Sequence, residues 1–103
     1  MTRYVWPEDV FVHKPAFLIT IDTEGDNLWQ KHDSITTENA RYLPRFQQLC
    51  EKYGFKPVWL TNYEMAIDPV YIEFAKDAIA RGTAEIGMHL HAWNSPPTDP
   101  LRS

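Results

Sequence analysis

The sequence predicts an α/β fold with a parallel sheet, built in the order strand, helix, strand, helix, strand. Three short apolar segments rich in β-favouring residues begin at Ala16, Pro57 and Thr83, and segments of helical periodicity separate them. No dipeptide typical of a tight hairpin, such as Asn-Gly, joins two of these segments. We therefore expect two consecutive βαβ units with right-handed crossovers.

The first strand is expected at residues 16–21, Ala-Phe-Leu-Ile-Thr-Ile. A nearly continuous apolar run of this length, bounded by Pro15 and Gly25, is typical of a buried parallel strand. Residues 22–34 are polar and include Gly25, which indicates a loop leaving the carboxyl end of the strand.

The first helix is expected to begin near Thr36 or Thr37, with capping residues before Glu38, and to end at Gly54. Pro44 lies inside this pattern and would remove a backbone hydrogen bond from a helix interior. The segment is therefore either one kinked helix or two abutting helical pieces. Its apolar stripe, expected to be buried, consists of Tyr42, Leu43, Phe46, Leu49, Cys50 and Tyr53.

The second strand is expected at residues 57–61, followed by an exit loop at 62–67. Asp68 and Pro69 then form an N-cap with proline at the first helical position, and Gly82 ends this second helix. The third strand, at 83–88, is followed directly by two histidines, and residues 94–100 are irregular by composition. The apolar face of the second helix consists of Tyr71, Phe74, Ala75, Ala78 and Ile79.

Composition limits the class of protein. Apolar residues make up 44% of the 103 residues and charged residues 23%, an ordinary globular balance that argues against disorder. The net charge of −4, with acidic and basic residues interspersed, provides no clustered basic face for nucleic acid. A single cysteine, Cys50, excludes an internal disulfide, and its place in a helical stripe favours a buried hydrophobe over a reactive thiol.

The ends of the chain suggest a cytoplasmic fragment of a larger fold. No apolar run of about 7–15 residues resembles a signal peptide, and none approaches the roughly 20 residues of a membrane span. A cytoplasmic location is therefore expected. Three strands alone would leave the edges and faces of a sheet poorly covered, which favours self-association. We expect residues 1–103 to be a single partial domain, the opening segment of a larger α/β barrel.

Two strand ends carry residues that bind metals. Asp22 and Glu24 follow the first strand, and His89 and His91 follow the third. Residues two apart in extended chain project to the same face, and active sites gather at the carboxyl ends of parallel strands. Two imidazoles and a carboxylate suit a divalent ion, above all zinc. The alternatives are a solvated acidic turn and a pair made of one core and one exposed histidine.

The remaining histidines and the tryptophans provide weaker signals. His13 and His32 have no comparable context and are expected at the surface. Trp29 and Trp93 lie in the loops of the expected site and are candidates for stacking on a sugar, against the alternative of core or lid residues. Trp6 and Trp59 are expected in the core or a lid.

Two segments resemble motifs of the polysaccharide deacetylases, carbohydrate esterase family four. Residues 17–26, Phe-Leu-Ile-Thr-Ile-Asp-Thr-Glu-Gly-Asp, resemble the first motif, commonly Thr-Phe-Asp-Asp-Gly, in its Asp-x-Glu or Asp-x-Asp variant. Residues 85–97, which begin Glu-Ile-Gly-Met-His, resemble the second motif. The resemblance covers residues 16–97, including the spacing of about 65 residues between the motifs. It is closest to members that act on bacterial surface-polysaccharide precursors, in O-antigen (lipopolysaccharide) and capsule pathways.

The resemblance implies a metal-dependent hydrolase that removes N-acetyl groups from a sugar, within a distorted barrel of about seven strand–helix units. Asp22 matches the general base, Glu24 the metal-binding carboxylate and His89 the first metal histidine. The second family histidine usually lies four positions later, where this chain has Trp93, so His91 is its substitute. The family's later motifs, including the histidine that acts as general acid, find no match before Ser103, so this chain alone would be an incomplete catalyst.

Three alternatives stay open at this point. One is hydrolysis of a different amide on the same scaffold, such as a cyclic ureide or an N-acylated small molecule. Another is a non-catalytic carbohydrate-binding module, whose sugar binding would not respond to a chelator. The third is a structural fragment in which the metal site never assembles.

Overall fold

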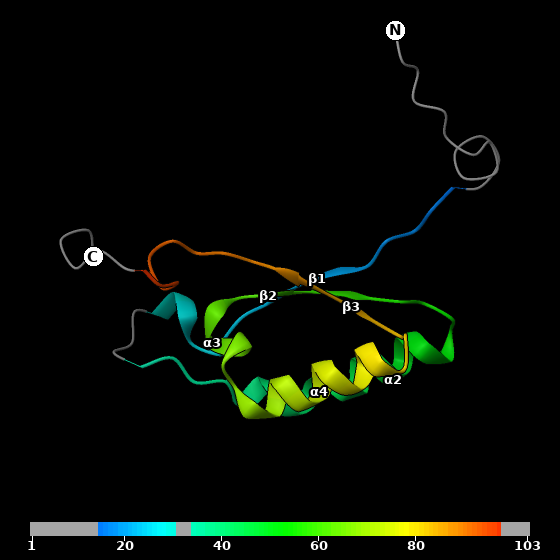
Figure 1. The fold of residues 1–103 in the computed structure, drawn as a ribbon, viewed down its shortest axis with the longest axis horizontal. Helices are drawn as coiled ribbons and strands as arrows, with labels where there is room; N and C mark the ends of the chain where they lie inside the picture. The colour runs from blue at the N-terminus through cyan, green and yellow to red at the C-terminus, as the bar shows by residue number, and fades with distance from the viewer. Residues whose placement is uncertain (1–14, 31–33, 98–103) are drawn as a thin grey trace, which may run out of the picture.

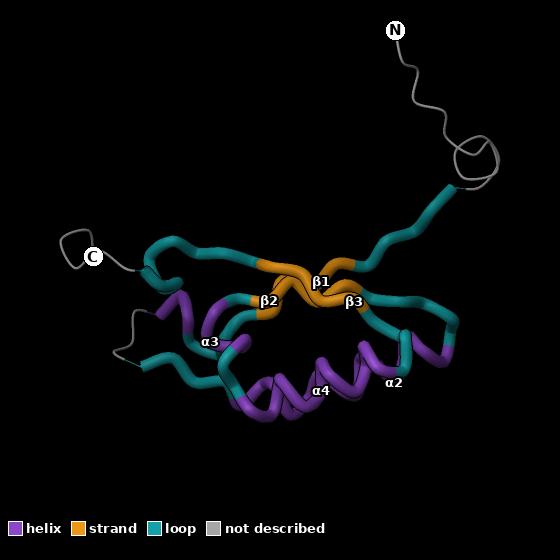
Figure 2. Tube along the Cα trace, viewed as in Figure 1, coloured by secondary structure: helices purple, strands orange, loops and turns teal. Residues whose placement is uncertain are grey.

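The computed structural model describes residues 15–30 and 34–97, which form a three-stranded parallel sheet with its two longest helices on one face (Figure 1). The strands β1 (Thr20–Thr23), β2 (Val58–Thr61) and β3 (Glu85–Met88) lie in the order β1-β2-β3. Both pairs are parallel. Both crossovers move one strand in the same direction, and both connecting helices lie on the same side of the sheet, as Figure 2 shows. Two crossovers of the same hand produce this arrangement. The predicted βαβαβ order is confirmed for the described residues, and the larger barrel stays a prediction.

The first strand begins later than predicted. β1 starts at Thr20 instead of Ala16 and runs to Thr23, its one buried residue. Phe17 and Leu18, which were expected inside the strand, are 74% and 77% exposed. The prediction of a buried strand was wrong because β1 is an edge strand, and among the described residues no layer covers the sheet face opposite the helices.

The connection from β1 to β2 consists of two abutting helical pieces, one of the two alternatives predicted. The 3₁₀ helix η2 (Glu38–Tyr42) leads directly into α2 (Leu43–Lys52). Pro44 lies in the first turn of α2, where a missing N–H removes no intrahelical hydrogen bond. Gly54, with a φ of 76°, lies two residues beyond α2, as predicted for its stop.

The N-terminus of η2 is capped from a distant part of the chain. The carboxylate of Asp26 accepts hydrogen bonds from the N–H groups of Glu38 and Asn39, at 2.8 and 2.9 Å. Thr37 makes no side-chain cap. The hydroxyl of Thr36 instead donates to Asp26 at 2.9 Å. The prediction that Thr36 or Thr37 caps this helix was therefore wrong.

The buried face of α2 centres on a polar residue that the hydrophobic pattern passed over. Gln47 is 1% exposed, and its amide donates to the carbonyl of Thr83 and accepts from the indole N–H of Trp59, both at 2.9 Å. Cys50 is buried, as predicted. The face of α2 that carries Gln47 and Cys50 packs against the sheet, so most of the predicted apolar stripe is exposed to solvent. Its exposed members are Tyr42, Phe46, Leu49 and Tyr53.

The predicted exit loop after β2 contains the short helix α3 (Tyr63–Ala66). Asn62 is its N-cap, and its side-chain oxygen accepts from the N–H of Tyr63 at 2.9 Å. The helix α3, which contains Glu64, lies at the same end of the sheet as the loops that follow β1 and β3 (Figure 1).

The helix α4 (Pro69–Ala80) begins as the sequence predicts. The carboxylate of Asp68 accepts from the N–H of Tyr71 at 2.8 Å, and Gly82 follows the helix with a φ of 69°. Of the predicted apolar face, Ile79 is exposed and Phe74 half-buried. The buried residues of the helix are Tyr71, Ala75 and Ala78.

The core lies between the sheet and the helices, around Trp59, which is 1% exposed. Ala78 and Ala84 complete one buried cluster, against which Ile21 and Ile86 pack. Phe74 meets the ring of Trp59 edge-on, with ring centroids 5.2 Å apart. A second buried cluster consists of Ala40, Met65, Tyr71 and Ala75.

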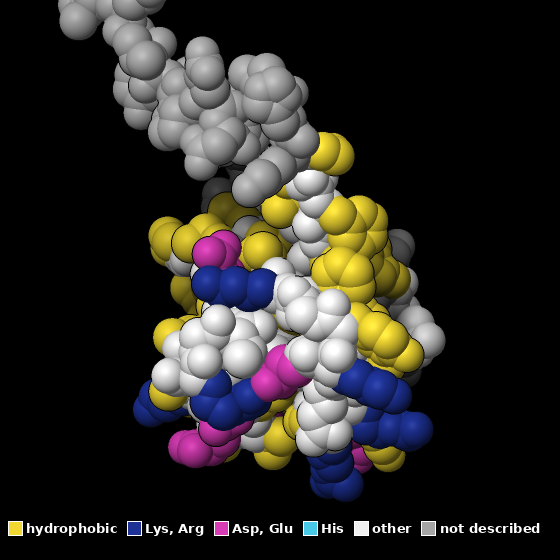
Figure 3. All heavy atoms as spheres, turned by 90° about the vertical axis from the view of Figure 1, so that its right-hand side faces the viewer, with side chains coloured by type: hydrophobic (Ala, Val, Ile, Leu, Met, Phe, Trp, Pro, Cys, Tyr) yellow, Lys and Arg dark blue, Asp and Glu magenta, His cyan; other side chains and the backbone are white. Residues whose placement is uncertain are grey.

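Large apolar side chains remain exposed along both edges of the sheet. Before the start of β1, Phe17 is exposed and contacts Phe55, an exposed residue that precedes β2, with ring centroids 5.6 Å apart. On the β3 side, Met88 and Leu90 are 78% and 62% exposed. Figure 3 shows hydrophobic, basic and acidic side chains exposed together at one end of the molecule. Self-association stays a prediction. No helix within the described segments has the length and apolar character needed to cross a bilayer.

Candidate metal centre

The register of the sheet places two of the sequence-predicted ligands at the same level. Thr23, Thr61 and Met88 are aligned across the three strands, so Glu24 and His89 each lie one residue beyond that line. The N–H of His89 donates to the carbonyl of Thr61 at 2.9 Å, which fixes the end of β3 against β2. The sequence predicted these residues at neighbouring strand ends, whereas β2 lies between β1 and β3. The side chains therefore converge across the end of the central strand.

The three predicted ligands meet at one carboxylate oxygen. Nε2 of His89 lies 2.6 Å and Nε2 of His91 lies 2.8 Å from Oε1 of Glu24. One ligand atom from each residue falls within 4.8 Å of the others. The side chains are 18% exposed for Glu24, 24% for His89 and 16% for His91, so the cluster is largely shielded but still reached by solvent. The structure thus brings together the three residues predicted to ligate a metal.

The electrostatics of this cluster favour a charged carboxylate. Burial by itself would raise the pKa of Glu24, but hydrogen bonds from His91, Trp29 and His89 outweigh it and hold that pKa below its ordinary value of 4.5. The indole N–H of Trp29 provides the third of these bonds, to Oε2 at 2.9 Å. Both oxygens of Glu24 are therefore oriented, and the carboxylate remains an anion at neutral pH.

Asp22 lies next to the cluster without joining it. Its residue position is two before Glu24 in extended chain, so both side chains project from the same face of the sheet. Oδ1 of Asp22 is 3.8 Å from Nδ1 of His89, beyond hydrogen-bond length. Its side chain is 64% exposed. Asp22 lies in β1 between the half-buried Ile21 and the buried Thr23, which places it on the sheet face opposite to theirs. Asp22 is thus accessible to water, and a change of its side-chain rotamer would bring its carboxylate into hydrogen-bond distance of His89.

Aromatic rings border the cluster on one side. Trp29 contacts His91 edge-on with centroids 5.0 Å apart, and the ring of Trp93 lies 5.1 Å from that of His91. The two indoles contact each other at 5.6 Å and 66°. They are 67% and 51% exposed, which leaves much of each ring free to contact a ligand. Of the other tryptophans and histidines considered in the sequence, Trp59 lies in the core. Trp6, His13 and His32 lie outside the described residues.

Three residues that the sequence reasoning did not select connect the loops of the site. Glu64 accepts hydrogen bonds from the N–H of Gly25 and from the amide of Asn94. Asn39 donates to the carbonyl of Glu24 at 2.7 Å. The position of Glu64 in the sequence could have indicated its role, because it follows the end of the middle strand, where functional polar residues gather in parallel α/β folds.

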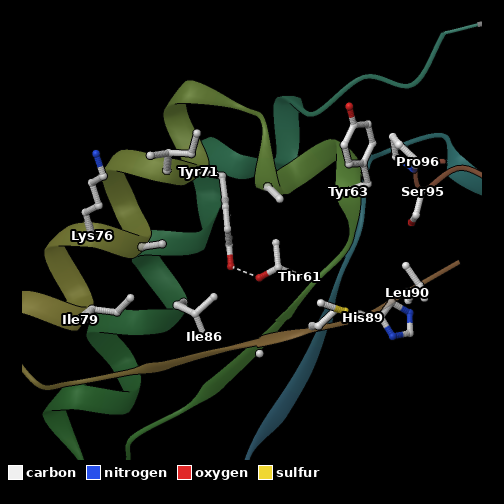
Figure 4. A pocket seen from close by; sticks show the side chains of 15 residues that line it. Thr61, Tyr63, Tyr71, Lys76, Ile79, Ile86, His89, Leu90, Ser95 and Pro96 are labelled. Carbon is white, nitrogen blue, oxygen red and sulfur yellow. Dashed lines mark hydrogen bonds between the residues drawn. The ribbon is translucent and has the colours of Figure 1, made fainter.

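An apolar groove lies beside the site, along the open edge of β3. It has a volume of about 510 Å³ and is lined by α4 and β3, with His89 at one end near Leu90 and Ser95 (Figure 4). The side chains of Tyr71 and Thr61 lie at its base and are hydrogen-bonded to each other. The groove contains no further predicted ligand, so its link to the metal cluster is His89.

Comparisons with family models, with curated proteins and with solved structures found no match to this chain. Its function is therefore inferred from the chemistry of its own residues.

Proposed function

We propose that this protein is a metal-dependent hydrolase that removes N-acetyl groups from a sugar or polysaccharide precursor. The observation that carries the proposal is the convergence of Glu24, His89 and His91 on one point at the end of a parallel sheet. The motif resemblance of residues 16–97 supports the choice of reaction, and the convergence supports the metal.

The donor set fits zinc or a similar divalent ion. Catalytic zinc sites use three protein ligands of nitrogen and oxygen, at distances of about 2.0–2.1 Å, so neighbouring ligand atoms stand roughly 3.3 Å apart. The two Nε2 atoms lie 2.6 and 2.8 Å from Oε1 of Glu24. Opening these hydrogen bonds by about 0.5–0.7 Å would make room for an ion. Ligation through Nε2 leaves the ring proton on Nδ1, and in His89 that atom is the one near Asp22.

A divalent ion in such a site supplies Lewis acidity, which polarises an amide carbonyl and makes a nearby water more acidic. The protein's own contribution is a base, a binding surface and fixed ligands. Asp22, exposed and adjacent to the cluster, would take the proton of the attacking water. Trp29 and Trp93 would contact the apolar face of the sugar ring. The water oxygen would bond to the acetyl carbon and the amide C–N bond would break, so that acetate is released and the amine left on the sugar takes up the protons of the water.

Metal content tests the site directly. The wild type is dialysed against zinc beside Glu24→Ala and His89→Ala, with Glu85→Ala as the control. Glu85 is an exposed glutamate at the opposite end of β3, where it pairs with Lys56 at 3.7 Å. We expect about one ion per chain in the wild type and control, and a loss in both site variants. A folded wild type that binds no ion would eliminate the proposal.

Acetate release from an N-acetylglucosamine oligosaccharide tests the reaction, measured on protein in which these residues are joined to the general acid that the resemblance implies. Asp22→Asn should abolish turnover and leave the zinc content unchanged, because a base is not a ligand. If Asp22→Asn loses its zinc instead, the carboxylate orients His89 and is not the base. Release of acid from other amides but not from acetylated sugars would support a different hydrolysis on this scaffold.

A second candidate is non-catalytic sugar binding, favoured by the exposed rings of Trp29 and Trp93 beside the cluster. This function predicts that oligosaccharide binding survives EDTA and is lost in Trp29→Ala or Trp93→Ala. Titration calorimetry with and without EDTA separates it from the hydrolase, for which metal removal should abolish turnover.

A further inference from the structure

Glu64 connects the two loops that carry the candidate ligands. It is 7% exposed and lies in α3, after the middle strand. Its Oε1 accepts from the backbone N–H of Gly25 at 2.7 Å, directly after Glu24. Its Oε2 accepts from the side-chain amide of Asn94 at 2.9 Å, in the turn that follows His91. One carboxylate thus binds both loops, although the strands that these loops follow, β1 and β3, do not pair with each other.

The local packing confirms that this bridge is tight. A Cβ at Gly25 would lie 3.1 Å from Cγ of Glu64 and 2.8 Å from the carbonyl oxygen of Thr36. A side chain at residue 25 would therefore push the backbone away from Glu64. Asn62 donates a third hydrogen bond to Oε1 at 3.2 Å, so the buried carboxylate is oriented by its own strand end as well.

We propose that Glu64 is a positioning residue that sets the relative placement of Glu24 and the two histidines. The inference rests on the proposed metal site. Outer-sphere partners that orient metal ligands typically change metal affinity by about ten- to a hundredfold when they are removed. Glu64 does not contact a candidate ligand side chain directly. It binds the backbone of the loop that carries Glu24 and a side chain in the loop that follows the histidines.

The bridge depends on hydrogen bonding more than on charge. In the described residues the side-chain oxygen of Asn94 is buried and has no partner. A glutamine at position 64 can still accept from Gly25 and can donate to that oxygen after the Asn94 amide rotates. Glu64→Gln is therefore the conservative variant that should preserve the site, whereas Glu64→Met has a similar length and removes every hydrogen bond.

The experiment measures cobalt(II) binding by visible absorption, together with hydrogen exchange of the Gly25 amide in metal-free protein. Gln47→Met is the matched control, because Gln47 is also buried and joins two partners away from the ligand loops. We expect Glu64→Met to weaken cobalt binding at least tenfold, change its absorption bands and accelerate Gly25 exchange. Glu64→Gln should bind within threefold of the wild type, and Gln47→Met should lower Tm without either effect.

The outcomes separate the two proposals. A folded wild type that binds no cobalt refutes the metal site, and the Gly25 exchange rates in Glu64→Met then still decide whether Glu64 holds the loop. Wild-type affinity and exchange in Glu64→Met overturn the positioning role, as does equal weakening in Gln47→Met. If Glu64→Met does not fold, Asn94→Ala removes the bridge to one loop and should weaken cobalt binding by about three- to tenfold; unchanged binding there overturns the role.

Discussion

A methyl group added at Gly25 should destabilise the protein and its metal centre together. In Gly25→Ala the new Cβ would lie 2.4 Å from Cγ2 of Ile35 and 2.8 Å from the carbonyl oxygen of Thr36. Carbon atoms in contact are normally about 3.5–4.0 Å apart, so the overlap with Ile35 exceeds an ångström. Ile35 can rotate away because it is only partly buried. The Thr36 carbonyl is less free to move, because it accepts from the N–H of Asp26 at 2.9 Å.

The expected cost follows from this difference. Relief requires the loop after β1 to shift by a few tenths of an ångström, and overpacking of this kind typically costs about 1–3 kcal/mol. The same shift lengthens the hydrogen bond from Gly25 to Glu64, which is 2.7 Å in the native loop. We therefore expect the free energy of unfolding to fall by about 2 kcal/mol and the zinc affinity to fall by about tenfold.

Urea denaturation and zinc titration of Gly25→Ala measure both effects, with Gly54→Ala as the control. Gly54 has no neighbour within 4 Å of an added Cβ, but its φ is 76°, so alanine there costs about 1–2 kcal/mol of backbone strain. The control should lose comparable stability and keep its zinc affinity. If Gly25→Ala is within about 0.5 kcal/mol of the wild type and binds zinc equally well, the close packing around Gly25 is wrong.

Three further changes test other parts of the structure. Burial alone would raise the pKa of Asp26, but the hydrogen bonds that its carboxylate accepts, including those from the start of η2, hold that pKa below the ordinary 3.8. The charged carboxylate therefore stabilises the fold fully above about pH 4, and this stabilisation is lost as the pH falls through the lowered pKa. In urea titrations across this range Asp26→Asn should be less stable at neutral pH and lose less stability on acidification, and a slope equal to that of the wild type would contradict the capping role. Trp29→Phe keeps an aromatic ring but removes the indole N–H that donates to Glu24. Zinc titration of this variant should show an affinity about three- to tenfold weaker than that of the wild type. An unchanged affinity would show that this hydrogen bond does not orient the ligand. Lysines at Leu18 and Met88, both more than 70% exposed at the sheet edges, should reduce any concentration-dependent association in light scattering, whereas an unchanged mass profile would exclude these edges as the contact.

Local signals in the sequence were sufficient for the order of elements and for the residues at two strand ends. Pro69 and Gly82 bound α4 as predicted, since proline fixes φ at a helix start and glycine accepts the positive φ at its end. Alternation of strand and helix patterns was enough to predict the parallel sheet. Glu24 directly follows β1 and His89 directly follows β3, so the fold class was enough to place both at the same end of the sheet.

Other features depend on contacts between residues far apart in the chain. Gln47 replaces part of the predicted apolar stripe because Trp59, 12 residues away, provides a buried partner for its amide. Asp26, which lies inside the first motif, caps a helix 12 residues later and takes no part in the metal cluster. Such pairings leave no periodicity in the sequence, because each partner is chosen by proximity in the folded chain.

The sequence by itself thus determined the βαβαβ order, the boundaries of α4 and the three residues that could hold a metal ion, Glu24, His89 and His91. Only the tertiary structure decided that β2 lies between the strands that carry them, that Glu24 reaches both histidines, and that Glu64, 39 residues from Gly25, holds their loops together. The physical reason is that hydrophobic periodicity and turn residues act over a few neighbouring positions. Hydrogen bonds across the end of a sheet depend on strand register and loop path, which exist only after the chain has folded.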